Sequence, residues 1–419
     1  MRREGHSTSP FRRTIRRLRG PVGAVAAGSA VGQVAIAAAL PLVARLYPAA
    51  DVGAFALALA YCQVTAIVLT CRLEQVLPRL DPGRRWVAAR LPLGSGLLLA
   101  PIVTVPVLYL ANQQFSLLDG IAVALMVSST CFMNVGTYAQ LAEKRFRSVA
   151  GLRVANGLVT AVAQILGGLI APEAWMLLLT YSLGNVAAVV VAAPSILRLR
   201  SWRDTSSSWS VIRTERLGRF ALNVGLGAAF SNLGLMLPLV GVSLLFGDAA
   251  AGSFFLARRF LMVPTQLVAT SISQVSYSIV ARETAARTRD IVHAWMRKSR
   301  IPAIATVLMG LVFAPIISVA VGPGYLNIGW VVALLSLPSA VQMIATSFSN
   351  VMLALRMEVA QTIWHAARLV GLVVLYVTAE SSNLSYLTTI VVFAAYGVLT
   401  YSSLLALTLF GLRMRNRAR

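Results

Sequence analysis

The chain has 419 residues, of which 58% are hydrophobic and only 12% are charged, and its mean hydropathy is +0.75. An average soluble domain is about 25% charged, so this chain has too little charge to cover a water-facing surface, which excludes a soluble globular protein. Lys and Arg number 37 against 14 Asp and Glu, a net charge of +23. In a soluble protein this excess would indicate nucleic acid binding, so the positions of the basic residues decide what it means.

Twelve stretches are long and apolar enough to cross a membrane, since a helical span needs about 20 largely apolar residues. They lack the period-two alternation of barrel strands, which predicts an all-α membrane protein. In chain order the predicted spans are 22–44, 53–71, 91–110, 120–141, 154–170, 174–197, 220–246, 251–280, 301–321, 328–355, 359–379 and 387–412.

The basic residues are distributed unevenly between these spans. Thirty-three of the 37 lie in the two tails or in alternate connections, and the other connections, such as 46–52 and 111–119, carry none. By the positive-inside rule, both termini and every basic connection lie in the cytoplasm. The charge therefore indicates topology in a cytoplasmic membrane, and we expect no nucleic acid partner.

Two short motifs recur at nearly the same spacing. Leu-Pro-Leu-Val at 40–43 returns at 237–240, and Gly-Ala-Phe-Ala-Leu-Ala at 53–58 returns as Gly-Ser-Phe-Phe-Leu-Ala at 252–257. The recurrence pairs the first span with the seventh and the second with the eighth. It predicts two parallel six-helix halves around a central cleft, as in alternating-access transporters.

This division predicts five segments along the chain. They are a basic cytoplasmic tail (1–21), an N-terminal six-helix half (22–197), a cytoplasmic linker (198–219), a C-terminal six-helix half (220–412) and a second basic tail (413–419).

Three stretches resemble the oligosaccharide flippase family of polysaccharide biosynthesis. They are Arg45 to Leu57, Arg72 to Pro78, and Gly252 through Arg258-Arg259 to Val275. One departure is that the family's usual Thr-Pro-Glu-Asp after Leu-Tyr is shortened to Pro48-Ala49-Ala50-Asp51. The resemblance implies a MATE-like fold, in the superfamily that also contains multidrug and toxin extrusion transporters.

The resemblance also implies an activity. Members of the family move undecaprenyl-diphosphate-linked oligosaccharide from the inner to the outer leaflet of the bacterial cytoplasmic membrane, for surface or exopolysaccharide biosynthesis. The expected partners are membrane lipids, the lipid-linked glycan, a polysaccharide polymerase and glycosyltransferases. No cofactor and no metal are expected.

Four arginines lie outside the cytoplasmic segments and are candidates for binding the diphosphate, because a guanidinium presents a planar fork of donors to phosphate oxygens. Arg258 and Arg259 lie several residues into the eighth span. Because they are adjacent, we expect one to face the cleft and the other to snorkel or to pair.

Arg368 lies near the middle of the eleventh span, with His365 three positions earlier on the same helix face. No acidic residue lies within a span interior to neutralise Arg368, which favours a substrate contact over ordinary pairing. Arg45 closes the first span, and an interfacial ion pair with Asp51 is the favoured alternative there.

Amides within the spans are candidates for glycan contact, with interhelical hydrogen bonding as the alternative for each. The candidates are Gln33, Asn134, Asn223, Asn232 and Gln342, with Asn156 and Gln164 as further in-span amides. Arg72 and Glu74, at the inner end of the second span, are candidates for a gating ion pair, with a solvated interfacial pair as the alternative. The three cysteines (Cys62, Cys71 and Cys131) fall within predicted spans and are expected to be inert.

Other function classes stay open at this point. A multidrug or metabolite exporter of the same superfamily is the alternative transporter, although exchange of a coupling cation generally needs a carboxylate inside the membrane. A polytopic enzyme acting on lipid-linked sugars would need acidic residues or a large outer loop, and the longest outer connection, 111–119, has one acid, Asp119.

Overall fold

The computed structural model describes residues 21–111, 116–201, 217–280, 285–354 and 357–417, so the amino-terminal tail and most of the expected linker lie outside the described residues. Within these ranges the chain forms twelve α-helices and one short 3₁₀ helix, and no strand. The helices are α2 (Pro21–Leu46), α3 (Ala49–Thr70), η1 (Leu73–Arg79), α4 (Pro82–Ala111), α5 (Leu117–Ala142), α6 (Phe146–Ile170), α7 (Ala174–Ser201), α9 (Leu217–Phe246), α10 (Asp248–Val280), α11 (Ala285–Val321), α12 (Ile328–Ala354), α13 (Glu358–Ser381) and α14 (Tyr386–Arg417).

Each of the twelve predicted spans coincides with one α-helix. Eleven helices of the described chain are long and apolar enough to cross a membrane, and α10 is outside that set because arginines and a polar carboxyl-terminal half lower its hydropathy. Three helices begin well before their apolar stretches: α4 at Pro82 rather than 91, α6 at Phe146 rather than 154, and α11 at Ala285 rather than 301. Hydropathy marks only the lipid-facing part of a helix, and the backbone continues beyond it.

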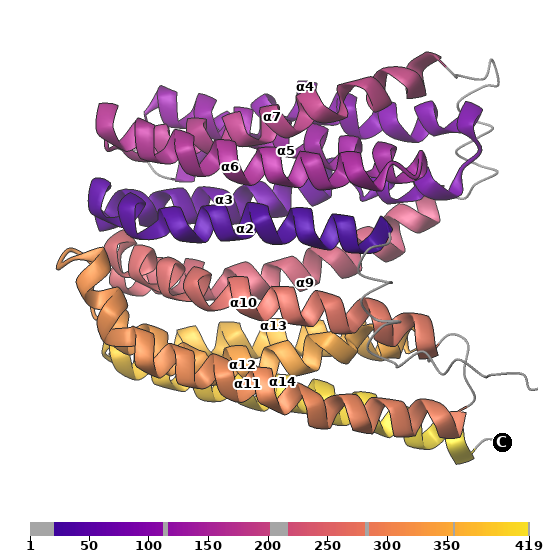
Figure 1. Cartoon of the computed structure of the whole chain (residues 1–419). Coiled ribbons are helices and arrows are strands. Elements are labelled where there is room, and N and C mark those ends of the chain that lie inside the picture. The colour runs from indigo at the N-terminus through magenta and orange to yellow at the C-terminus, as the bar shows by residue number, and fades with distance from the viewer. Residues whose placement is uncertain (1–20, 112–115, 202–216, 281–284, 355–356, 418–419) are drawn as a thin grey trace, which may run out of the picture.

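The helices form two groups with matching internal contacts (Figure 1). In the first group α2 packs on α6, α5 on α7 and α4 on α5; in the second, α9 packs on α13, α12 on α14 and α11 on α12. These pairs correspond when the first helix of one group is matched with the first of the other. The predicted architecture of two six-helix halves is therefore confirmed.

Helices α3 and α10 join the two halves at one end of the bundle. A Cβ added to Gly53 of α3 would overlap the carbonyl oxygen of Asp248, and one added to Gly252 of α10 would overlap that of Ala49. Gly53 and Gly252 are the first residues of the repeated motif. The repeat thus marks the close crossing of two equivalent helices about the axis that relates the halves.

We call the end where α2 finishes and α3 begins the outer end, after the side on which the positive-inside rule predicts it. A second pair of contacts between the halves lies there: Arg45 donates from Nε to the carbonyl of Ala320 at 2.7 Å and from Nη2 to that of Val319 at 3.2 Å. The hydroxyl of Tyr325 donates to the buried carbonyl of Tyr47 at 3.1 Å. The two halves are therefore sealed together at the outer end.

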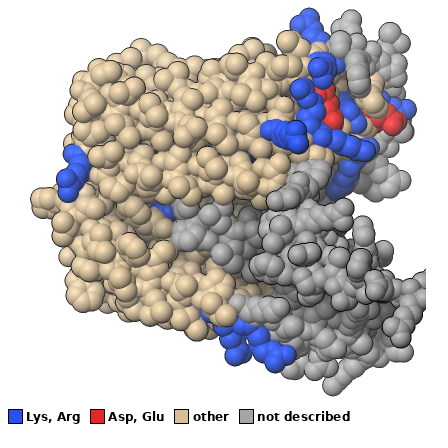
Figure 2. All heavy atoms as spheres, in the orientation of Figure 1, with Lys and Arg blue, Asp and Glu red and all other residues tan. Residues whose placement is uncertain are grey.

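We call the opposite end, where α3 meets η1 and α5 meets α6, the basic end. Figure 2 shows that most of the visible Lys and Arg side chains gather there, with the acidic ones beside them. In the upper half of this view, the surface between the two ends is free of charge, as a lipid-facing belt should be.

Candidate functional site

A cavity of about 560 Å³ lies between the two halves, on the basic-end side of the α3–α10 crossing. Its lining in α3 runs from Ala56 to Ile67 and continues to Arg72, and in α10 it runs from Phe254 to Ala269. Ten of the twelve α-helices contribute to it; α4 and α11, which are equivalent in the two halves, do not. The expected central cleft is thus a cavity built by both halves.

Five arginines line this cavity, and they are the feature that distinguishes it. They come from both halves: Arg72, Arg153, Arg258, Arg259 and Arg368. No Asp or Glu of the described residues is among the lining side chains. An uncompensated positive charge in a low-dielectric site is costly and attracts an anion.

Arg368 of α13 is 8% exposed and points at a weakened turn of α9. Its Nη2 donates to the carbonyl of Gly234 at 3.0 Å. That carbonyl lies four residues before Pro238, which has no N–H to give it. The guanidinium also lies over the rings of Tyr401, at 4.9 Å, and Trp364, at 5.8 Å.

The adjacent arginines of α10 both line the cavity, whereas we expected only one of them to do so. Arg258 donates from Nη1 to the carbonyl of Leu235, one residue beyond the acceptor of Arg368. Arg259 lies over the ring of Phe255, 5.3 Å from its centroid. Their different partners follow from the 100° step between neighbouring helix positions.

Two of the candidates for binding the diphosphate lie away from the cavity. Arg45 caps the last carbonyls of α11 at the outer end and does not pair with Asp51, whose carboxylate accepts the N–H of Ala174 at 3.1 Å instead. His365 is half-buried with its ring against Trp364, at a centroid distance of 5.0 Å, and is not a lining residue.

The predicted gating pair does not form an ion pair among the described residues. Arg72 lines the cavity in a left-handed conformation (φ 57°), whereas Glu74 of η1 is fully buried beside it. Neither carboxylate oxygen of Glu74 has a hydrogen bond of ordinary geometry. Burial raises the pKa of Glu74, and the nearby Arg72 opposes that rise.

Sequence reasoning missed Arg153 because it was counted with the cytoplasmic loop before the fifth span. In the structure α6 begins at Phe146, so Arg153 lies seven residues, or about 10 Å, inside the helix and reaches the cavity. Its charge interacts with the phenols of Tyr138 and Tyr181. A helix start placed at Phe146, from the turn at Lys144, could have identified it.

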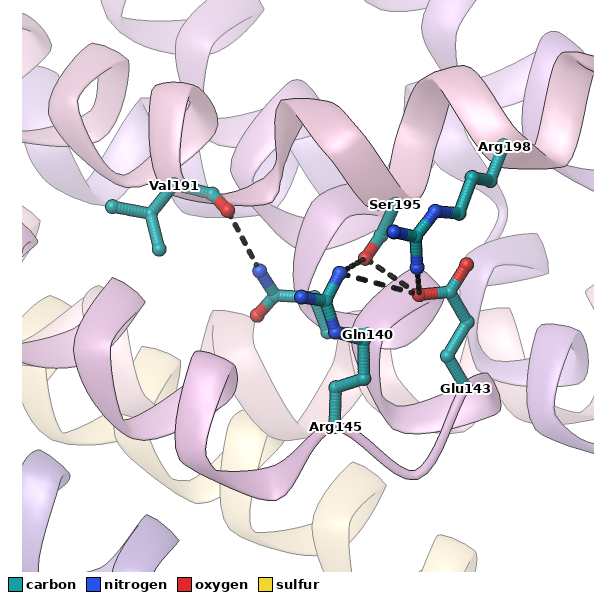
Figure 3. A network of polar contacts seen from close by, with 6 residues as sticks. All are labelled: Gln140, Glu143, Arg145, Val191, Ser195 and Arg198. Carbon is teal, nitrogen blue, oxygen red and sulfur yellow. Dashed lines mark hydrogen bonds and ion pairs between the residues drawn. The ribbon is translucent and has the colours of Figure 1, made fainter.

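A polar network at the basic end fixes the start of α6 (Figure 3). Ser195 of α7 donates to Glu143 at 2.8 Å, and Arg145 and Arg198 lie 3.7 Å from the same carboxylate oxygen. Gln140 donates to the carbonyl of Val191 at 3.0 Å. Since these groups join the α5–α6 turn to α7, they set the position of the helix that carries Arg153.

The predicted glycan-contacting amides divide into two groups. Gln33, Asn134, Asn232 and Gln342 line the cavity, and Asn232 also donates to the carbonyl of Ala228 in its own helix at 2.8 Å. The backbone of Asn223 belongs to α9, but its side chain lies outside the described residues.

Of the two further amides, Asn156 is engaged between helices. Asn156 lines the cavity and donates to Asn185 at 2.9 Å, and Gln164 is buried without being a lining residue.

Two of the cysteines, Cys62 and Cys131, are buried within helices as expected. Cys71 is exposed and lies just past the end of α3, so its placement within a span was wrong.

Aromatic side chains complete the lining and were not singled out from the sequence. Tyr181, Phe255 and Phe393 line it between the arginines and the α3–α10 crossing, and Tyr396 and Tyr401 lie beside Arg368. Such rings were unremarkable in an apolar sequence, since a ring on a membrane helix most often faces lipid or a neighbouring helix.

The sequence matches no protein-family model and no curated protein, but solved structures share its fold. An inward-facing multidrug resistance MATE family transporter of the MOP superfamily has a TM-score of 0.65 at 13% identity. The match covers 94% of this chain and 95% of that transporter. An outward-facing MATE family transporter also has a TM-score of 0.65, at 14% identity, and the match covers 96% of this chain and 97% of that transporter. A MOP superfamily transporter from Pyrococcus furiosus is described as having a binding pocket of reverse polarity. Its TM-score is 0.61 at 14% identity, and the match covers 96% of this chain and 97% of that transporter. These likenesses confirm the predicted MATE-like fold.

Proposed function

We propose that the protein is a flippase that moves an undecaprenyl-diphosphate-linked oligosaccharide from the inner to the outer leaflet of a bacterial cytoplasmic membrane by alternating access. The observation that carries the proposal is the charge of the cavity, with five arginines and no carboxylate among its described lining residues. A diphosphate is the part of such a substrate that matches this charge, because guanidinium groups bind phosphate oxygens through paired hydrogen bonds.

The remaining lining suits the rest of the substrate. Three amides, those of Gln33, Asn134 and Gln342, face the cavity without a hydrogen bond to another described residue, so their donors and acceptors are available to sugar hydroxyls. The lipid chain would stay in the bilayer while the head group crosses. In the cell, glycosyltransferases would supply the substrate on the cytoplasmic side, where the positive-inside rule predicts both termini, and a polymerase would use it outside.

The alternative is a multidrug exporter, which the likeness to multidrug MATE transporters favours. Against it stands the cavity charge, since a cationic drug would enter a site that already holds five arginines. The Pyrococcus furiosus transporter, whose pocket polarity is described as suggesting a different function, indicates that this fold accommodates more than one kind of pocket. A polytopic enzyme lacks support, since no lining carboxylate of the described residues could act as acid or base.

Deletion of the gene tests the proposal. We expect lipid-linked oligosaccharide to accumulate on the cytoplasmic leaflet and surface polysaccharide to be lost, with restoration by the wild-type gene. Arg368→Ala should insert normally and fail to restore display, whereas Arg297→Gln, an exposed residue of α11 outside the cavity, should restore it. Drug sensitivity with normal surface polysaccharide would overturn the flippase proposal in favour of the exporter.

A further inference from the structure

Pro238 weakens α9 at the point where this helix lines the cavity. Proline has no N–H, so the carbonyl of Gly234 loses its donor within the helix, and the ring disturbs the adjacent turn. Inside a membrane such freed carbonyls must be satisfied by groups from neighbouring helices. An interrupted turn of this kind can act as a hinge.

Neighbouring helices donate to three carbonyls of this turn, that of Gly234 among them, through two cavity arginines and one tyrosine. Arg368 of α13 donates to Gly234 at 3.0 Å, and Arg258 of α10 donates to Leu235. The hydroxyl of Tyr376 donates to the carbonyl of Pro238 itself at 3.0 Å. We call Arg258 and Arg368 together the clasp.

Two glycines of α9 lie beside Arg368 and Tyr376. A Cβ on Gly241 would overlap the ring of Tyr376, and the Cβ position of Gly234 lies 3.8 Å from Nη1 of Arg368. The guanidinium and the phenol therefore rest directly on the α9 backbone. Arg368, a cation that lacks a carboxylate partner among the described residues, is thus joined to the carbonyl that loses its helical donor to Pro238, and Arg258 adds a donor one residue further on.

We propose that a phosphate-bearing ligand in the cavity competes with the α9 carbonyls for the two guanidinium groups of the clasp, so that ligand binding releases the hinge at Pro238. This inference rests on the proposed function, because it takes the diphosphate as the ligand. It makes Arg258 and Arg368 positioning residues for α9 as well as ligand-binding residues, and it supplies the link between an occupied cavity and a change of helix conformation.

Competition follows from the relative strength of the two acceptors. Both acceptors make charge-assisted hydrogen bonds with a guanidinium, but a backbone carbonyl carries only a partial charge, whereas each phosphate carries a full one and can accept two parallel hydrogen bonds. In a cavity with little water this difference grows. A ligand that takes both guanidinium groups leaves the carbonyl of Gly234 without a donor and removes the interhelical donor of Leu235, and the turn can then relax only by changing its geometry.

The expected motion is large enough to measure. From Gly234 to Gly218 the basic-end limb of α9 is about 24 Å long. A change of about 20° at the hinge, the size that separates a kink from gentle curvature, moves its tip by about 8 Å. The limb would carry the lining residue Asn232 with it.

Double electron–electron resonance on the full chain tests the inference, with spin labels at Gly218→Cys and Ile301→Cys in a Cys71→Ser background. A Cβ on Gly218 meets no atom within 4 Å, Ile301 of α11 is 74% exposed, and the other two cysteines are buried. Adding inorganic pyrophosphate should shift the distance distribution by several ångströms. Arg368→Gln should shift it in the same direction without ligand, whereas Arg259→Gln, which removes a lining cation that does not touch α9, should not.

Pyrophosphate affinity gives a second, independent measurement. Pro238→Ala restores the helical N–H, which frees the clasp, so the affinity should rise about three- to tenfold, the factor that one hydrogen bond is worth. Pro338→Ala is the matched control: it removes a proline of α12 that lines the same cavity, and no side chain of the described residues donates to the carbonyl four residues before it. Its affinity should stay at the wild-type value.

The outcomes separate the two proposals. Pyrophosphate binding without a distance change, together with equal affinities for Pro238→Ala and Pro338→Ala, would overturn the clasp and leave the proposed function standing. A wild-type protein that binds no pyrophosphate would overturn both. A distance change that Arg259→Gln reproduces without ligand would overturn the assignment to Arg258 and Arg368, because it would show that any loss of cavity charge moves α9.

Discussion

Arg368 shows how one side chain can stabilise a fold and still bind a ligand. A guanidinium carries five N–H donors, and one of them is used by the carbonyl of Gly234. A central arginine in a membrane helix costs about 2.5–3.5 kcal/mol on insertion scales, and its position over the rings of Tyr401 and Trp364 offsets part of this cost. These contacts stabilise Arg368 within the membrane, and its remaining N–H donors are available to bind a ligand.

Glu74 is the buried carboxylate of the basic end, and its ionisation should control stability. Burial raises the pKa of Glu74, so the folded chain holds its proton at pH values where the unfolded chain has lost it. The stabilisation is therefore complete below the ordinary pKa of glutamate and is lost as pH rises towards the raised value. Glu74→Gln should raise the thermal unfolding midpoint at pH 8 by removing an unsatisfied carboxylate, worth about 1–3 kcal/mol, and have little effect at pH 4.

Thermal unfolding in detergent at the two pH values measures this difference. Glu380→Gln, at an exposed glutamate near the end of α13, is the matched control and should leave the midpoint unchanged at both. If Glu74→Gln instead lowers the midpoint at pH 8, the ionised carboxylate stabilises the fold through Arg72, and the direction argued here is wrong.

At the scale of elements, the α3–α10 crossing should decide whether the outer end closes. Gly53→Ala places a methyl group on the carbonyl of Asp248, so the two helices must separate there, at a cost of about 1–3 kcal/mol to the closed arrangement. A cysteine at Ala56, a lining residue one turn deeper, should then react about 5- to 100-fold faster with an impermeant maleimide added from outside.

Gly94→Ala in α4 is the control for this substitution, because a Cβ there meets no atom within 4 Å. It adds the same methyl group to a membrane helix without touching the crossing. Equal labelling rates for Gly53→Ala and Gly94→Ala would mean that the crossing does not hold the outer end closed.

At the scale of the whole molecule, sequence alone predicted the fold better than the site. Hydropathy and charge are properties of long segments, so twelve spans followed from them, and the two halves followed from the two recurring motifs. Arg153 was missed because hydropathy does not locate the start of α6, and Arg45 was included because nothing local reveals that the last carbonyls of α11 lie beside it. Contacts between the halves depend on tertiary packing, which a single sequence without homologues does not encode in any readable pattern.

The two halves must separate at the outer end if the substrate leaves there, and this gives a direct test of alternating access. Arg45 of α2 contacts the carbonyl of Val319 of α11, and both positions are exposed. Replacing both by cysteine and joining them with a short, reducible bifunctional thiol reagent should stop the appearance of new surface polysaccharide, and a reductant should restore it. Each single-cysteine variant treated in the same way should be unaffected. Continued export by a fully cross-linked protein would mean that the substrate crosses without opening of the outer end, and a rocking motion of the two halves would then be excluded.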